Sequence, residues 1–197
     1  MDRHRGIRGF TLLEMLTVIA IIGIIVAVSI PSFATYRRRA AVRAAAAELR
    51  AVVHLARSRA ISHARFSGLK FRRDGDRWVW LLYDDGDGDG LQNADINSGV
   101  DPLVSGPHRL LEGITDLRIA LPPFPLPNPD GGRPLPPEGS PVRFGRSTLC
   151  SFSPRGSASS GSIYLTDGRE MVAAVRVYGP TARVRMMLFD SAIGRWR

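Results

Sequence analysis

The chain starts with a short basic segment and continues with a long run of apolar residues. Between Phe10 and Ile30 only Glu14 carries a charge, and the small polar residues do not interrupt the run. About 20 apolar residues in a helix are enough to cross the hydrocarbon core of a membrane. The run is too long and too apolar on every side for an amphipathic helix of a soluble domain. We therefore predict a transmembrane helix over residues 10–30, with a buried core helix as the alternative.

A cleaved secretory signal peptide is a second alternative, because it also has a basic start and an apolar middle. The apolar run here exceeds the roughly 7–15 residues that are usual for that middle region. No small-residue cleavage site follows it, and the helical pattern continues through Tyr36 and Arg37. These features predict that the helix stays on the mature protein.

Beyond Pro31 the pattern becomes that of an amphipathic helix continuing to about residue 64. Apolar residues recur at a spacing of three and four, which is typical of one helix face. These residues are Val42, Ala45, Ala46, Leu49, Val52, Val53, Ala56 and Ala60. Arg43, Arg50 and Arg57 recur at a constant spacing and should share another face. That face is either solvated or in contact with acidic neighbours or an anionic ligand.

From Phe66 onward the pattern is that of β-strands. Segments 67–73 and 77–83 are rich in apolar and aromatic residues, and Asp74-Gly75-Asp76 between them is typical of a hairpin turn. Further strands are expected at 115–121, 142–144, 149–152, 162–165, 171–178, 183–189 and 194–197. Segment 122–141 is rich in proline and glycine and should form an irregular loop. The expected fold class is α+β, a long N-terminal helix packed on an antiparallel β-sheet domain.

Composition and charge narrow the possible functions. The 197 residues suffice for one helix and one modest domain, and the net charge is +9. Lys70 is the only lysine, so the basic charge is almost entirely arginine, whose planar fork binds carboxylates and phosphates through two hydrogen bonds. Cys150 is the only cysteine, which rules out an intramolecular disulfide. The arginines before the apolar run favour an orientation with the N-terminal segment in the cytoplasm and the bulk outside.

Glu14 is a carboxylate inside an apolar run, where a charge costs about 2.5–3.5 kcal/mol at the centre of a membrane helix and less near its end. It should therefore have a cationic partner outside its own helix. The sequence Gly9-Phe10-Thr11-Leu12-Leu13-Glu14 resembles the class III signal of type IV pilins and type II secretion pseudopilins. This resemblance implies that a prepilin peptidase cuts after Gly9 and methylates the new N-terminus at Phe10. It also implies that Glu14 pairs with the N-terminal amine of a neighbouring subunit.

The resemblance implies a division of the chain into three parts. Residues 1–9 would be the leader peptide, residues 10–64 the N-terminal helix, and residues 65–197 a β-rich globular pseudopilin domain. The fold would be type IV pilin-like.

Two downstream segments resemble the C-terminal domain of GspH/FimT-type minor pseudopilins. They are Phe152-Ser153-Pro154-Arg155-Gly156-Ser157-Ala158 and Gly161-Ser162-Ile163-Tyr164-Leu165. In that family a Gly-Arg-x-Arg sequence often follows; here Thr181-Ala182-Arg183-Val184-Arg185 has alanine for glycine, and Gly194-Arg195-Trp196-Arg197 ends the chain.

This second resemblance implies a component of the periplasmic pseudopilus of a type II secretion system. The protein would be held in the bacterial inner membrane by a single helix, with its C-terminal domain in the periplasm. Its partners would be other pseudopilins or pilins, the prepilin peptidase and the inner-membrane assembly platform. One alternative is a FimT-like DNA-binding minor pilin of a DNA-uptake pilus. Another is a membrane-anchored domain that never polymerises.

The arginines near the C-terminus are candidates for nucleic-acid binding. In FimT-type pilins the equivalent arginines bind DNA. Arg183 and Arg185 are two apart on a strand and should point to the same face. A basic patch for phosphates would also include Arg176, Arg195 and Arg197, and Trp196 would stack on a base. The alternatives are an ordinary exposed strand face and contacts to neighbouring subunits.

A short acidic segment is a candidate for calcium binding. Asp85, Asp87 and Asp89 fall at positions 1, 3 and 5 of an EF-hand-like loop, and Asn93 falls at position 9. Position 12 is Ile96 rather than a bidentate carboxylate, and no pair of flanking helices is expected. The two hypotheses are weak calcium binding and a plain acidic surface loop. No serine or cysteine has plausible histidine and acid partners, so we do not expect an enzyme.

Overall fold

The computed structural model describes residues 10–112, 117–191 and 193–197, and in the first of these ranges the side chains of residues 28–32 and 34 are not described. The predicted leader at residues 1–9, including the cleavage residue Gly9, lies outside the described residues. The chain divides into two compact units, Met1–Arg38 and Arg39–Arg197. The two units are considered separately below.

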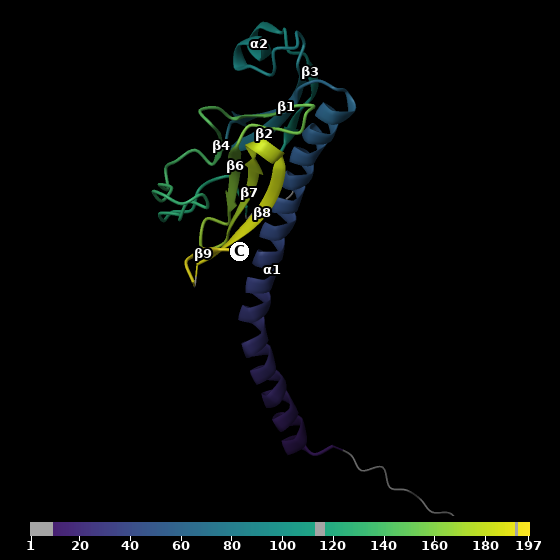
Figure 1. Ribbon diagram of the computed structural model, residues 1–197. Coiled ribbons are helices and arrows are strands. Elements are labelled where there is room, and N and C mark those ends of the chain that lie inside the picture. Colours follow the sequence, from purple (N-terminus) through teal and green to yellow (C-terminus); the bar gives the residue numbers. More distant parts are fainter. Residues whose placement is uncertain (1–9, 113–116, 192) are drawn as a thin grey trace, which may run out of the picture. The chain divides into compact units, whose positions relative to one another are not determined.

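The first unit contains the start of a long helix, α1 (Leu12–Ser62) (Figure 1). The hydroxyl of Thr11 accepts a hydrogen bond from the backbone N–H of Glu14 at 3.2 Å, so Thr11 is the N-cap. A Thr followed three residues later by Glu is the sequence of a capping box. Glu14 also lies in the first turn, where a negative charge interacts favourably with the helix dipole. Local sequence therefore explains why the helix begins at Leu12.

The described part of α1 in the first unit is apolar and exposed around its whole circumference, from Leu12 to Ala27. Nothing in this part of the chain covers its large side chains. Among the described residues, none of the helices has both the length and the apolar character required to cross a membrane.

The second unit contains two antiparallel sheets (Figure 1). The strands of the first sheet are β1 (Ser67–Asp74), β2 (Arg77–Asp84), β3 (Leu103–Arg109) and β5 (Leu149–Phe152), in the order β3-β2-β1-β5. The hairpin of β1 and β2 pairs without interruption from Ser67 opposite Asp84 to Asp74 opposite Arg77, which confirms the predicted turn.

The second sheet has five strands in the order β4-β6-β7-β8-β9. They are β4 (Val142–Phe144), β6 (Gly161–Thr166), β7 (Val172–Tyr178), β8 (Arg183–Asp190) and β9 (Arg195–Trp196). A 3-10 turn, η1 (Gly179–Thr181), joins β7 to β8, and a short helix, α2 (Asn93–Ser98), lies between β2 and β3. The predicted strands in 142–144, 149–152 and the C-terminal third are therefore confirmed to within a few residues.

Three features differ from the sequence-based expectation. The strand predicted at 115–121 is wrong as far as it can be described: residues 113–116 lie outside the described part, and 117–121 contain only an isolated bridge at Arg118. Neither β3 nor α2 was predicted. The strands also form two sheets rather than one, because β5 pairs with β1 while β4 pairs with β6.

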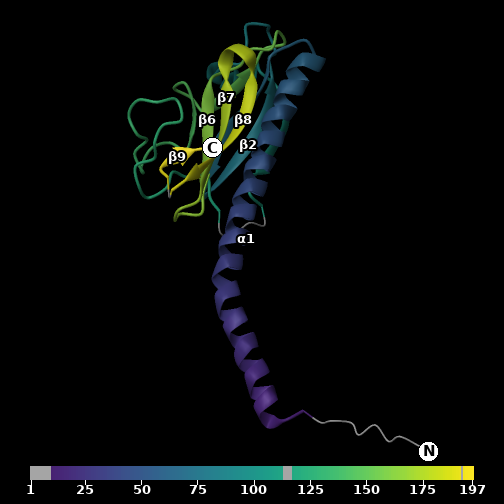
Figure 2. The ribbon, with the colours of Figure 1, turned by 60° about the horizontal axis from the view of Figure 1, so that its bottom comes forward.

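The second half of α1 runs along the sheets (Figure 2) and contributes to the main core. Its buried residues are Val42, Ala45, Ala46, Leu49, Val53, Ala56 and Ala60, and they pack with buried residues of both sheets. On a face of the helix beside this stripe, Arg43 and Arg50 are exposed and Arg57 is half-buried. The predicted apolar stripe is thus the face that the sheets cover.

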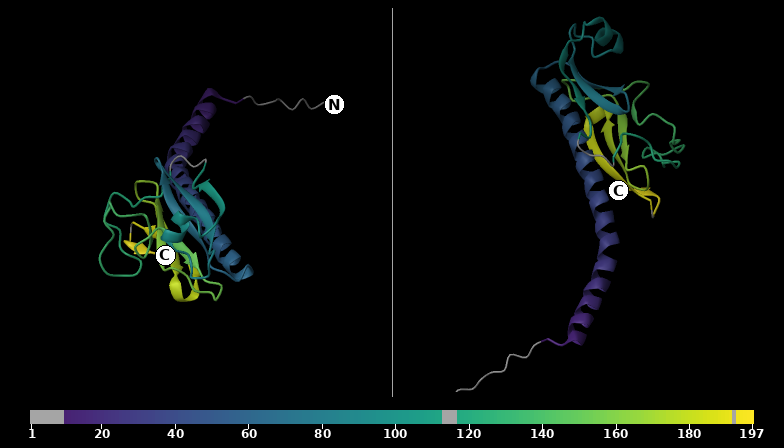
Figure 3. Two further views of the ribbon diagram at one scale, coloured as in Figure 1. Left: turned by 90° about the horizontal axis from the view of Figure 1, so that it is seen from above. Right: turned by 180° about the vertical axis from the view of Figure 1, so that it is seen from behind.

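The five-stranded sheet is covered on both faces for part of its area. Ile163 and Val175 belong to the core under α1, whereas Tyr164 and Ala174, which alternate with them, belong to a second cluster. The second cluster is completed by Leu121 and Leu126 from the proline-rich segment, which lies on the side of this sheet away from α1 (Figure 3). We call this side the outer face. The proline-rich segment is irregular, as expected, apart from a bridge between Leu126 and Leu135.

Candidate functional site

The N-terminal motif is described from Phe10 onward. Phe10 and Glu14 are both exposed. The backbone of Glu14 is engaged in the helix start, through its N–H to Thr11 and its carbonyl to the hydroxyl of Thr17. Its carboxylate makes no ion pair with any described residue. An acid in this position is therefore available to a cation from another molecule.

The acidic segment forms a braced loop between β2 and β3. Asp85 is buried, and its two carboxylate oxygens accept backbone N–H groups of Gly88 at 2.8 Å and Gly90 at 3.1 Å. Asp101, also buried, accepts the N–H groups of Gly86 at 3.1 Å and Gln92 at 3.2 Å. These two aspartates hold the loop by satisfying four backbone donors that would otherwise be unpaired.

Gly86 is required by the same packing. A Cβ atom at this position would collide with the carbonyl oxygen of Val100, so the backbone approaches too closely for any side chain. The loop is therefore rigidly built rather than a loose acidic segment.

The structure brings together three of the four predicted calcium ligands. One carboxylate oxygen from each of Asp85, Asp87 and Asp89 lies within 4.8 Å of the others. Carboxylate oxygens are the ligands that calcium prefers. Asn93 is bonded elsewhere: its amide oxygen accepts from Lys70 Nζ at 2.5 Å and its amide nitrogen donates to Ser147 at 3.1 Å. Calcium binding by the three aspartates stays a prediction.

Negative charge accumulates in this loop. Five aspartates and no basic residue occur from Asp85 to Asp101. Loss of hydration and then the carboxylates of Asp89, Asp87, Asp101 and Asp85 raise the pKa of Asp95. A positively charged ligand or partner would relieve this repulsion.

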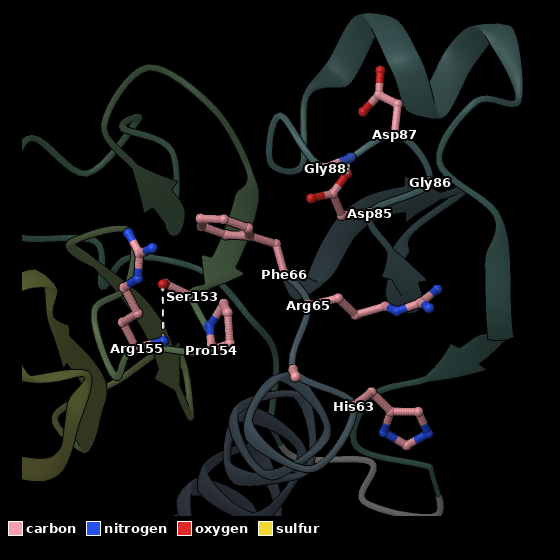
Figure 4. Close-up of a pocket in the computed structure, with 11 residues that line it drawn as sticks. His63, Arg65, Phe66, Asp85, Gly86, Asp87, Gly88, Ser153, Pro154 and Arg155 are labelled. Carbon is pink, nitrogen blue, oxygen red and sulfur yellow. Dashed lines mark hydrogen bonds between the residues drawn. The ribbon is translucent and has the colours of Figure 1, made fainter.

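A pocket of about 530 Å³ lies beside the acidic loop (Figure 4). The ring of Phe66 points between the turn at Ser153 to Arg155 and the turn at Asp85 to Gly88. The Ser153 hydroxyl accepts from the backbone N–H of Arg155, while the His63 ring contacts Ser62 and the carbonyl of Arg59. The hydroxyl and the imidazole are thus engaged separately, which is not the arrangement of a nucleophile and its base.

Basic residues gather on the outer face of the five-stranded sheet. The strand register places Arg143, Ser162, Arg176 and Arg185 in one row across β4, β6, β7 and β8. In the next row Tyr178 of β7 is opposite Arg183 of β8. The guanidinium carbons of Arg176 and Arg185 lie 5.6 and 6.0 Å from the centre of the Tyr178 ring. The structure therefore brings together Arg176, Arg183 and Arg185 as predicted.

Arg143 was not predicted as a member of this group. Its signal in the sequence is its position between the two buried residues Val142 and Phe144, which directs it to the opposite face. What could not be read from the sequence is that β4 pairs with β6.

The structure separates the C-terminal arginines from this face. Trp196 pairs with Phe189, whose side chain is on the outer face, so Arg195 and Arg197 point the other way. Arg197 forms an ion pair with Asp190 at 3.0 Å. The predicted basic patch is therefore divided in two.

Trp196 is a structural residue. Its indole N–H donates to the carbonyl of Pro127 at 2.7 Å, and its ring packs against Tyr164 and Phe189. Part of its ring and its indole N–H are thus used in the second hydrophobic cluster, and base stacking on Trp196 stays a prediction.

Comparison with known proteins adds one finding. Residues 4–30 match the protein family described as the prokaryotic N-terminal methylation motif. Neither a curated protein nor a solved structure matches the chain. The motif implies a type IV pilin-like or pseudopilin-like protein that is processed by a prepilin peptidase and assembles with other pilins. The α+β architecture is consistent with a type IV pilin-like fold.

Proposed function

We propose that this protein is a minor pseudopilin of a type II secretion system. It is made as an inner-membrane precursor, cut between Gly9 and Phe10, and assembled into the periplasmic pseudopilus with its C-terminal domain facing the periplasm. The observation that carries this proposal is the methylation motif at residues 4–30, which ends in an apolar helix.

The mechanism is packing rather than catalysis. Between Leu12 and Val26 the exposed large side chains of α1 are Leu12, Leu13, Met15, Leu16, Val18, Ile19, Ile21, Ile22, Ile24, Ile25 and Val26. A contiguous apolar surface of this kind is covered by lipid or by partner helices. In the precursor the cover is the membrane, and in the fibre it is the helices of neighbouring subunits. The assembly platform transfers the helix from one to the other.

Glu14 sets the register of this assembly. Cleavage after Gly9 creates an amine at Phe10, and that amine on one subunit neutralises the Glu14 carboxylate of its neighbour. A charge in an apolar bundle is tolerated only when it is paired, so a misaligned helix leaves both groups unpaired.

A second function, DNA binding by a minor pilin of an uptake system, is favoured by one observation. Arg176, Arg183 and Arg185 lie together on an outer face that could contact phosphates. A mobility shift that is lost in the double variant Arg183→Ala with Arg185→Ala, and kept in Arg72→Ala with Arg73→Ala, would support this function.

The proposed function is tested by expressing the full chain with and without a prepilin peptidase. We expect the mature protein to begin at Phe10 and to carry an N-terminal methyl group, as measured by N-terminal sequencing and mass spectrometry. Glu14→Ala should be processed normally yet fail to enter sheared pseudopili. A mature protein that begins elsewhere, or a Glu14→Ala variant that assembles like the wild type, would show that the proposal is wrong.

A further inference from the structure

The basic residues of the outer face form a regular array, which we call the arginine row: Arg143, Arg176, Arg183 and Arg185. Adjacent strands of a sheet lie about 4.8 Å apart, so the stems of Arg176 and Arg185 start at about that separation. Tyr178 lies beside both guanidinium groups and helps to hold them in place. The row therefore presents several arginine forks at a short and defined spacing.

One position of the row is already occupied by a carboxylate of the same chain. Asp130 of the proline-rich segment forms an ion pair with Arg176 at 2.5 Å. Arg143, Arg183 and Arg185 are exposed, and none of them forms an ion pair with a described residue. The contact of Asp130 shows what kind of group the row accepts, a carboxylate presented by a loop.

The acidic loop between β2 and β3 carries matching groups. Asp87 and Asp89 are exposed, and their carboxylate oxygens lie within 4.8 Å of one another. The loop is braced by Asp85 and Asp101, so little ordering is needed before its carboxylates meet a partner.

We propose that the acidic loop of one copy of the chain docks on the arginine row of a second copy. Asp87 and Asp89 of one copy would pair with Arg183 and Arg185 of the next, in charge-assisted hydrogen bonds. The inference rests on the proposed function in one respect, that the chain enters a fibre, and it adds that two copies of the chain are neighbours there. It adds a contact between C-terminal domains to the contact between N-terminal helices.

The geometry of this contact suits a fibre. The two surfaces belong to different sheets, since the acidic loop follows β2 of the first sheet and the row crosses the second. A contact between two different surfaces is head-to-tail, and it extends from copy to copy unless the rotation closes a ring. Complementary charge at such a contact selects the partner and its orientation.

The inference is tested by crosslinking in membranes of cells that make two tagged versions of the full chain. One version carries Asp87→Cys and the other Arg185→Cys; the native Cys150 is fully buried and does not compete. An arginine–aspartate pair holds its backbones farther apart than the roughly 7 Å that a disulfide spans, so the reagent is a short bismaleimide. We expect a dimer that carries both tags, in several-fold higher yield than for Asp87→Cys paired with Arg73→Cys, an exposed arginine outside the row.

A charge swap gives a second measurement. Arg183→Glu with Arg185→Glu should reduce the crosslink of a reporter pair at Asp95→Cys and Arg143→Cys, and Asp87→Arg with Asp89→Arg in the other copy should restore it. Rescue supports the inference, because two damaged surfaces would not recover together by loss of folding.

The failures can be told apart. If the mature chain begins at Phe10 and Ile19→Cys copies crosslink through their helices while the Asp87 and Arg185 positions do not, the inference is wrong and the proposed function stands. A chain that is not processed and shows no helix crosslink contradicts the proposed function instead. If the charge reversal abolishes binding of a DNA duplex and leaves the crosslink yield unchanged, the row is a nucleic-acid surface and the inference is overturned.

Discussion

The two parts of α1 bury apolar residues in different ways. In the second unit Leu49 and its neighbours form one stripe, and Leu49 is 0% exposed beneath the two sheets. In the first unit the apolar residues surround the helix, and Ile19 is 65% exposed. Among the described residues the chain covers the second of these parts, and under the proposed function lipid or partner molecules cover the first. Stability and assembly should therefore depend on different parts of the same helix.

The largest expected effect is that of a substitution in the buried stripe, and it separates the contribution of α1 to stability from its contribution to assembly. Leu49→Ala should lower the free energy of unfolding of the Arg39–Arg197 unit by about 2–5 kcal/mol, because it leaves a cavity in a fully buried site. Ile19→Ala should leave that free energy unchanged and should instead reduce assembly. The measurement is urea unfolding in detergent followed by tryptophan fluorescence, together with the yield of sheared fibres.

Leu55→Ala is the matched control, since Leu55 is on the same helix and 49% exposed. It should cost less than about 1 kcal/mol, because much of its side chain is already in water. An Ile19→Ala variant that unfolds as easily as Leu49→Ala would show that the first part of α1 is also covered by the chain itself.

The next effect concerns the end of the buried part of α1. Arg59 donates two hydrogen bonds to Asp84 of β2, at 2.9 and 2.8 Å, and Ser67 donates a third at 2.6 Å. Asp84→Asn should lower the free energy of unfolding by about 1.5–3 kcal/mol, the usual worth of hydrogen bonds to a charged group. Asp130→Asn, which removes the more exposed partner of the ion pair with Arg176, should cost less, about 1 kcal/mol.

The ion pair of Arg59 and Asp84 also predicts that the free energy of unfolding depends on pH. Burial by itself raises the pKa of Asp84, but the hydrogen bonds from Arg59 and Ser67 and the charge of Arg59 outweigh it, so the pKa lies below its ordinary value. A carboxyl with a lowered pKa stabilises the fold above its ordinary pKa of about 3.9 and loses that contribution as the pH falls through the lowered value. Acid unfolding of the wild type should therefore be steeper below about pH 4 than that of Asp84→Asn. Equal slopes would contradict the assignment.

The structural features that were predicted well from the sequence are those that depend on residues close together in the chain. The helix, its apolar stripe and the hairpin of β1 and β2 follow from periodicity and turn residues over short distances. β3 was missed because Gly106 and Pro107 fall within it and read as a turn. α2 was missed because a six-residue helix shows no apolar periodicity.

In the candidate sites, too, local spacing could be predicted from the sequence, whereas contacts between distant residues could not. The closeness of Asp85, Asp87 and Asp89 is set by their spacing in one loop. Asn93 is tied to Ser147, which is 54 residues away, and Trp196 to Pro127, which is 69 residues away. Such partners depend on tertiary packing, and no local pattern reports them.

The smallest effect bears on how Glu14 acts. Glu14 is both the third residue of the helix capped by Thr11 and the proposed counter-charge for assembly. Thr11→Ala should weaken the helix start by about 1 kcal/mol, which corresponds to roughly fivefold faster hydrogen exchange in the first turn, while Thr11→Ser should keep the cap.

Glu14→Gln tests the charge separately from the cap. Glutamine can replace glutamate at this position of a capping box, so the substitution removes the negative charge and keeps the capping sequence. If charge pairing drives assembly, Glu14→Gln should abolish it while first-turn exchange rises only by the lost interaction with the helix dipole, and Thr11→Ala should assemble despite its faster exchange. The reverse result, with assembly following the cap rather than the charge, would mean that Glu14 acts by starting the helix and that the first part of α1 needs no counter-charge from its neighbour.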